Sequence, residues 1–260
     1  MSAIWPREHG AYGQAGFPLL TALVLADVAV ASVLIALAVV GVFLAHEPMQ
    51  VLLGARGARA RREHGRQAIR WSGIWVALAV IAGAAGLVSM SPAGRWTVVW
   101  PVVPAVIVLV AAVRGREKTT VPEVGAAAAL SLAAVPVCLA GGLDGRVAAA
   151  VGAVYAVTFA LMTLAVRVVV LTMRAGAQGP AAAASRRVVI GAAVVGLCAA
   201  VGAWIYGAWS VTVPLALVPG VIVASALAVR PPRATKLRLV GWVLVGTSCA
   251  AMAVLIGGLR

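Results

Sequence analysis

The chain has 260 residues, of which 63% are hydrophobic and 11% are charged, and its formal net charge is +14. Soluble domains carry roughly 25% charged residues, so a soluble fold of this length would leave too much apolar surface in water. The composition excludes an ordinary soluble protein and indicates a single transmembrane domain that comprises residues 1–260.

Nine apolar segments follow one another along the chain, and each is close to the ~20 residues that a helix needs to cross a bilayer. We therefore predict an all-α polytopic membrane protein with about nine transmembrane helices. Their expected ranges are 11–27, 29–54, 71–89, 96–113, 123–142, 147–171, 187–209, 211–229 and 237–258. No small-residue cleavage site follows the first apolar run, so we expect its helix to remain in the protein rather than to be removed as a signal peptide.

The Lys and Arg residues fall almost entirely into alternate connections between these helices. Connections rich in Lys and Arg face the cytoplasm, so the alternation predicts nine helices with the N-terminus inside and the C-terminus outside. The longest basic connection, residues 55–70, reads ARGARARREHGRQAIR and is compatible with a helix. It is interpreted either as a topology signal that contacts anionic lipid head groups or as a lid that attracts an anionic substrate.

Two other features of the composition give little information about function. The positive charge does not indicate a partner made of nucleic acid, because topology explains it and no basic stretch is interleaved with aromatic residues. The three cysteines, Cys138, Cys198 and Cys249, lie within apolar runs without the spacing of a metal site. We expect them to be small buried hydrophobic residues.

Ionisable residues inside or at the edge of membrane helices are costly, so they mark candidate functional positions. The candidates are Glu8, His9, His46, Glu47, Arg56, Glu123 and Arg167. All are expected at the cytoplasmic ends of helices or just beyond them, where they could pair across helices and form a site open to the cytoplasm. Structural interpretations stay open for Arg167, which can extend to the interface, and for Glu123, whose carboxylate suits a helix N-terminus.

No cofactor is predicted. Imidazole and carboxylate groups suit zinc or iron, so a divalent metal at the His and Glu candidates is chemically conceivable. Their spacing matches no metal motif, however, and HExxH is absent. The sequence also lacks a phosphate-binding P-loop, a dinucleotide fingerprint and a GxSxG nucleophile motif.

Three stretches of the N-terminal half resemble the YwiC-like family of bacterial membrane proteins. They are PREHGAYGQAGFPLLTAL at 6–23, FLAHEPMQVLLGARGARARRE at 43–63 and RGREKTTVPEVGAAAALSLAAVP at 114–136. The pairing of EHGA with AHEP is the most specific part of the pattern. The resemblance implies a multi-pass protein of the bacterial plasma (inner) membrane, and it implies no particular activity.

The layout is also similar to that of the UbiA-type intramembrane prenyltransferases, a family with nine helices and an active site at the cytoplasmic ends of helices 2 and 6. Those enzymes hold magnesium on a prenyl diphosphate with two aspartate-rich motifs. Here the second helix and its connection offer only Glu47 and Glu63, and residues 155–179 contain no carboxylate and have Arg167 instead. The usual magnesium site cannot be built, so the resemblance implies at most a divergent transferase and leaves open whether the chain is an enzyme.

The leading functional hypothesis is the binding or modification of a lipophilic ligand, such as a prenyl lipid or a quinone-like molecule, in a cytoplasm-facing intramembrane pocket. The expected head-group site consists of Glu8, His9, His46 and Glu47, with positive charge from Arg56 and Arg167. The expected partners are membrane lipids and this small molecule, without nucleic acid. The alternatives are a membrane transporter, to which ionisable residues in kinked helices are suited, and a non-catalytic scaffold.

Overall fold

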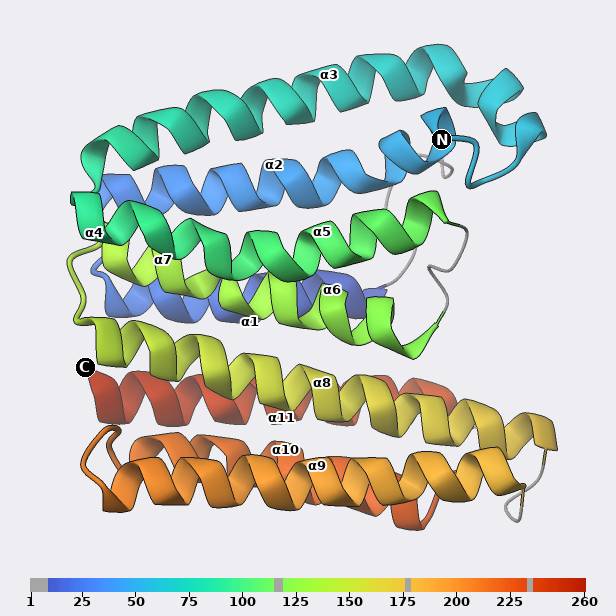
Figure 1. Ribbon diagram of the computed structural model, residues 1–260, viewed down its shortest axis with the longest axis vertical. Coiled ribbons are helices and arrows are strands. Elements are labelled where there is room, and N and C mark those ends of the chain that lie inside the picture. Colours follow the sequence, from blue (N-terminus) through green and yellow to red (C-terminus); the bar gives the residue numbers. More distant parts are fainter. Residues whose placement is uncertain (1–8, 115–118, 176–178, 233–235) are drawn as a thin grey trace.

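The computed structural model describes residues 9–114, 119–175, 179–232 and 236–260, and all regular structure within these ranges is helical. The helices lie side by side along one direction and form a single bundle (Figure 1). In chain order they are α1 His9–Leu25, α2 Val30–Leu52, α3 Ala58–Ser89, α4 Pro92–Arg95, the 3-10 helix η1 Trp96–Val98, α5 Val99–Val113, α6 Thr120–Leu132, α7 Ala134–Ala140, α8 Gly145–Ala175, α9 Pro180–Ile205, α10 Thr212–Val229 and α11 Leu237–Leu259.

The predicted polytopic membrane bundle is confirmed. Within the described ranges, eight helical segments are long and apolar enough to cross a membrane, and α1 is a shorter apolar helix. Two of the eight are composite, because Pro92–Ala111 contains α4, η1 and most of α5, and Thr120–Ala140 contains α6 and α7. The second interruption has a local cause: Pro136 has no N–H to donate to the carbonyl of Leu132, and α6 ends at that residue.

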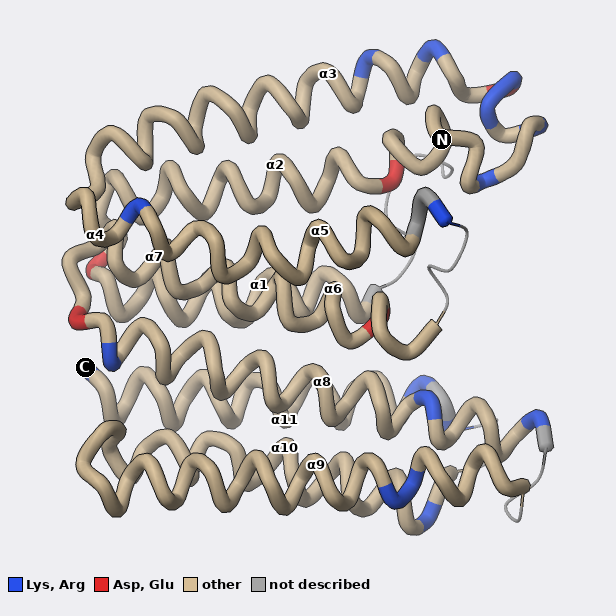
Figure 2. The backbone as a smooth tube through the Cα atoms, in the orientation of Figure 1, with Lys and Arg blue, Asp and Glu red and all other residues tan. Residues whose placement is uncertain are grey.

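Most of the described Lys and Arg residues lie at the end of the bundle where α2 ends and α3 begins, which we name the basic end (Figure 2). They are Arg56, Arg59, Arg61, Arg62, Arg66, Arg70, Arg114, Arg167, Arg174, Arg186, Arg187, Arg230, Lys236 and Arg238. The described cations toward the opposite end are Arg95, Arg146 and Arg260. That the basic end faces the cytoplasm stays a prediction, based on the positive-inside rule.

The predicted basic connection is, for most of its length, the beginning of a helix. α3 has 32 residues, and at 1.5 Å per residue it is about 48 Å long, compared with about 30 Å for the hydrocarbon core of a bilayer. Trp71 and Trp75 stack with ring centroids 5.8 Å apart, and tryptophan concentrates at membrane interfaces. The arginine-rich first turns of α3, which precede Trp71, therefore extend beyond the hydrocarbon.

Helices α2 and α3 form a close hairpin at the margin of the bundle (Figure 1). A Cβ atom added at Gly41 would lie 2.8 Å from the carbonyl oxygen of Trp75, and one at Gly86 would lie 2.7 Å from Cδ1 of Ile35. Glycine is therefore required at Gly41, where the obstacle is backbone, whereas a larger residue at Gly86 would displace the Ile35 side chain. Such small residues let helices associate closely in lipid. Among the described residues, α3 packs mainly on α2 and makes only a few contacts with α7.

Helix α1, in contrast, lies in the interior, where it contacts α2, α6, α7, α8 and α11. The Thr21 hydroxyl donates a hydrogen bond to the carbonyl of Phe17 at 2.8 Å. Its oxygen lies 2.6 Å from the hydroxyl of Tyr155 on α8 and accepts a hydrogen bond from it. Both Thr21 and Tyr155 are fully buried, so this bond links the two central helices within the core.

Candidate functional site

The end of α2 places a buried carboxylate next to an exposed imidazole. Glu47 is 6% exposed, whereas His46 lies on the outer surface of the helix. Neighbouring residues of an α-helix point about 100° apart, which is why adjacent positions meet such different surroundings. Pro48 follows within the helix and has no N–H to donate to the carbonyl of Leu44, so α2 continues with one backbone hydrogen bond missing.

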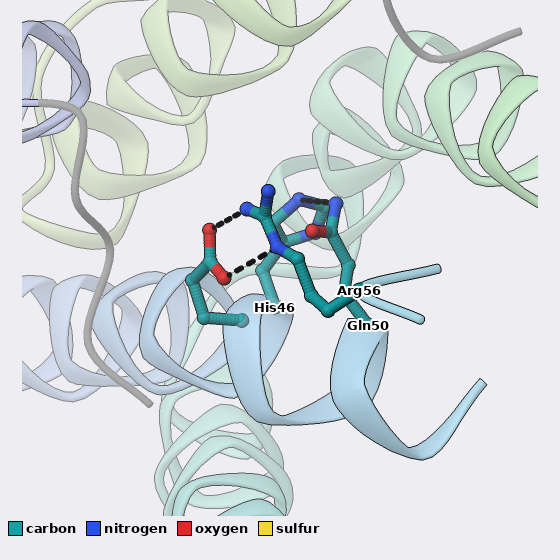
Figure 3. Close-up of polar contacts among 4 residues, drawn as sticks. His46, Gln50 and Arg56 are labelled. Atoms are coloured by element: carbon teal, nitrogen blue, oxygen red, sulfur yellow. Dashed lines mark hydrogen bonds and ion pairs between the residues drawn. The ribbon is translucent and has the colours of Figure 1, made fainter. Parts of the chain in front are cut away.

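Arg56 neutralises the buried carboxylate (Figure 3). The connection after α2 contains Gly54 and Gly57, both with positive φ, a conformation that suits glycine and lets the chain turn back within a few residues. Nε of Arg56 donates to Oε2 of Glu47 at 3.2 Å, and Nη2 of Arg56 donates to the other carboxylate oxygen. This two-bond geometry makes strong ion pairs. The Glu47 side chain is 8% exposed and that of Arg56 is 37% exposed, so the pair joins the interior to the surface.

His46 is held by a residue one helical turn further on. The Nε2 atom of Gln50 lies 2.9 Å from Nε2 of His46 (Figure 3). An amide nitrogen can only donate, so in this arrangement Gln50 donates to the imidazole. The end of α2 and its connection therefore gather an imidazole, a carboxylate and a guanidinium within one small region at the basic end.

A second ion pair joins α6 to α8. Nη1 of Arg167 donates to Oε2 of Glu123 at 3.3 Å. Glu123 lies in the first turn of α6, where the positive end of the helix dipole also favours a carboxylate. Both side chains are partly exposed, at 40% for Glu123 and 31% for Arg167. This pair is accounted for by its structural role, because it fastens the start of α6 to the last turns of α8.

Four of the seven predicted residues form two separate ion pairs. Within the described chain, no hydrogen bond or ion pair joins Glu47 and Arg56 to Glu123 and Arg167. Glu8 lies outside the described residues, and His9 is described only as the first backbone position of α1. Their participation in the head-group site stays a prediction.

Sequence reasoning did not identify a row of polar side chains between α1 and α8. Besides the Thr21–Tyr155 bond, Nε2 of Gln14 donates to the hydroxyl of Thr163 at 3.5 Å. The two partners on α1, Gln14 and Thr21, are seven residues apart and therefore share one face of α1. That spacing was the available signal. It indicates a polar seam between α1 and α8.

None of the predicted site residues lines either of the following two grooves of the described surface. One, of about 600 Å³, lies between α10 and α11 at the basic end. The other, of about 370 Å³, lies at the opposite end, between the start of α8 and the connection from α9 to α10. Among the described residues, no three His, Cys, Asp or Glu side chains are grouped so as to hold a metal ion.

The half of the chain that carries Glu47, Arg56 and Glu123 matches a known family model. The model is described as YwiC-like protein and matches residues 5–138, slightly more than half of the chain. The chain belongs to the YwiC-like family. The match ends within α7, so Arg167 and helices α8 to α11 of this YwiC-like protein lie beyond it. No curated protein and no solved structure matches the chain. The similarity of layout to the UbiA-type prenyltransferases stays an expectation.

Proposed function

We propose that this YwiC-like membrane protein binds or modifies a lipophilic ligand, of the prenyl or quinone-like class, whose polar head lies at the basic end of the bundle beside His46 and Arg56. The ligand tail would extend along the apolar outer surface of α2. This assignment follows from three properties of the residues around His46: their exposure, their charge and their depth along the helix.

The observation that carries the proposal is the position of His46 in an apolar, exposed stripe of α2. Val42, Met49 and Leu53 precede and follow it at helical spacing, and all three side chains are exposed, Val42 by 62%. An imidazole that faces lipid in such a stripe is unfavourable unless both of its ring nitrogens have polar partners, and within the described chain Gln50 binds only one of the two, Nε2. A ligand with a polar head and an apolar tail would satisfy both the ring and the stripe.

The neighbouring groups suit the head of such a ligand. The imidazole and the guanidinium of Arg56 can donate hydrogen bonds to a quinone carbonyl or to phosphate oxygens. Arg56 stays available because its side chain is partly exposed while it binds Glu47. Tyr12 of α1 meets Phe43 of α2 edge to face, with centroids 5.4 Å apart, one turn before His46. This pair adds an aromatic wall next to the stripe.

Native mass spectrometry with lipid extraction tests the proposal. The wild-type protein is purified in a mild detergent beside His46→Gln and a matched control, His64→Gln, which changes a histidine of α3 at the same end of the bundle. We expect an isoprenoid or quinone-like molecule in the wild type and in the control, and its loss from His46→Gln. Equal contents in all three proteins would refute the proposal. Solute uptake by proteoliposomes would then favour a transporter, and a stable co-purifying protein would favour a scaffold.

A further inference from the structure

The groove between α10 and α11 combines an apolar interior with a basic mouth. It is lined by Ser225, Ala226, Leu227, Val229, Arg230, Pro232, Lys236, Leu239, Val240 and Val243. Its volume is about 600 Å³. No residue of the Glu47–Arg56 pair or of the Glu123–Arg167 pair contributes to it, so it is independent of the site proposed above.

The sequence fixes the two cations at the mouth. Arg230 precedes Pro231 and Pro232, and a residue before proline disfavours the helical conformation, so α10 ends at Val229. On the other side, Lys236 is the N-cap residue of α11. Both side chains are exposed. Trp242, which is 65% exposed on α11, is of the type that lies at the membrane interface, and it places the mouth near the level of lipid head groups.

These cations lack a counterion from the described part of the chain. Arg230 and Lys236 take part in none of its ion pairs, and the described acids of the basic end each bind another arginine: Glu47 binds Arg56, Glu63 binds Arg59 and Glu123 binds Arg167. A pair of unneutralised positive charges at head-group level attracts an anion from outside the protein.

We infer that this groove binds one anionic phospholipid. Its phosphate would lie between Arg230 and Lys236, and an acyl chain would run along Leu227, Leu239 and Val243, where burial of each CH₂ group favours binding. The hydroxyl of Ser225 lies on the wall five residues before Arg230, about 7.5 Å deeper along the helix, where it can donate to an ester carbonyl. A zwitterionic lipid fits less well, because its ammonium group would face the same two cations.

Competition between two lipids with identical acyl chains, phosphatidylglycerol and phosphatidylcholine, tests the inference by native mass spectrometry of the delipidated full chain. Each cation next to an anionic lipid contributes roughly a fivefold preference, or roughly 30-fold for two. We expect the wild type to prefer phosphatidylglycerol and Arg230→Gln/Lys236→Gln to lose most of this preference. Arg187→Gln removes an exposed cation of the same end from outside the groove and should retain it. Thermal unfolding of each variant verifies that it is folded.

Two further arms separate a lipid site from a simple charge effect. Ala226→Trp fills the exposed groove without changing a charge, and it should lower the retention of phosphatidylglycerol. Inorganic phosphate, added without lipid at the same concentration, should not displace the bound lipid. An unchanged preference in Arg230→Gln/Lys236→Gln, unchanged retention in Ala226→Trp or displacement by inorganic phosphate would each overturn the assignment.

Discussion

Replacement of Arg56 by alanine should expose the dependence of Glu47 on its partner. Arg56→Ala removes both hydrogen bonds to the carboxylate and leaves a charge on a side chain that is only 8% exposed. Removal of one partner from a fully buried ion pair destabilises a protein by about 3–5 kcal/mol. Since the Arg56 side chain is 37% exposed and water can enter the space that it leaves, we discount this figure to about 2 kcal/mol.

Glu47→Gln gives a different expectation. It keeps the shape of the side chain, removes the buried charge and leaves Arg56 free to turn toward solvent, so we expect a loss of about 1 kcal/mol. The double variant, Arg56→Ala/Glu47→Gln, has no uncompensated buried carboxylate. It should also lose about 1 kcal/mol, rather than the sum of about 3 kcal/mol that independent sites would give.

The assay is equilibrium unfolding in mixed micelles, with the free energy of unfolding compared among the variants. The control is Arg59→Ala, which breaks the Arg59–Glu63 pair on the projecting part of α3, where the side chains are 89% and 51% exposed. Such surface pairs contribute little, and we expect a change within about 0.5 kcal/mol. If Arg56→Ala destabilises no more than Arg59→Ala, or if the double variant loses the sum of the single losses, the pair does not hold Glu47 in the way that we describe.

Two other variants test helix packing with the same measurement. Gly41→Ala places a Cβ atom 2.8 Å from the Trp75 carbonyl oxygen and should lower the free energy of unfolding by about 1–3 kcal/mol. The control, Gly73→Ala, meets open space and should leave the free energy of unfolding unchanged. Equal effects of the two variants would contradict the close approach of α2 and α3. Tyr155→Phe removes a buried interhelical hydrogen bond and should lower the free energy of unfolding by about 0.6 kcal/mol. Its control, Tyr206→Phe, changes a residue that is 90% exposed and should leave the free energy of unfolding unchanged.

The helices were predictable because lipid requires long apolar segments, and hydropathy alone reveals them. Their ends were less predictable where a helix continues into water. α3 starts at Ala58 and α9 at Pro180, before the predicted starts at 71 and 187, because the arginine-rich first turns of α3 and the alanine-rich first turn of α9 are compatible with a helix without being long apolar segments. The interruption before Pro136 is readable only from the missing N–H of that residue.

The sequence indicated which end of the bundle holds the candidate residues, but it did not indicate which of these residues form ion pairs with one another. The predicted helix ends do place Glu123 and Arg167 within reach of one another, although the sequence could not say which carboxylate meets which cation, because that depends on the rotation of each helix about its axis. Arg56 was expected to supply positive charge, and its contact with Glu47 requires the turn through Gly54 and Gly57. The exposure of His46 depends on the same rotation, which hydropathy does not report.

The contrast between α1 and the α2–α3 hairpin has a consequence for biogenesis. The main packing contact of the hairpin, between α2 and α3, can form once Ser89 has been synthesised, and the contacts of α2 with α7 follow later. α1 must wait much longer: Tyr155, which binds Thr21, follows it by 134 residues. During that interval the Thr21 hydroxyl is already satisfied by the carbonyl of Phe17 in its own helix. The Thr21 side chain therefore needs no partner from α8 while the helices between α1 and α8 are inserted.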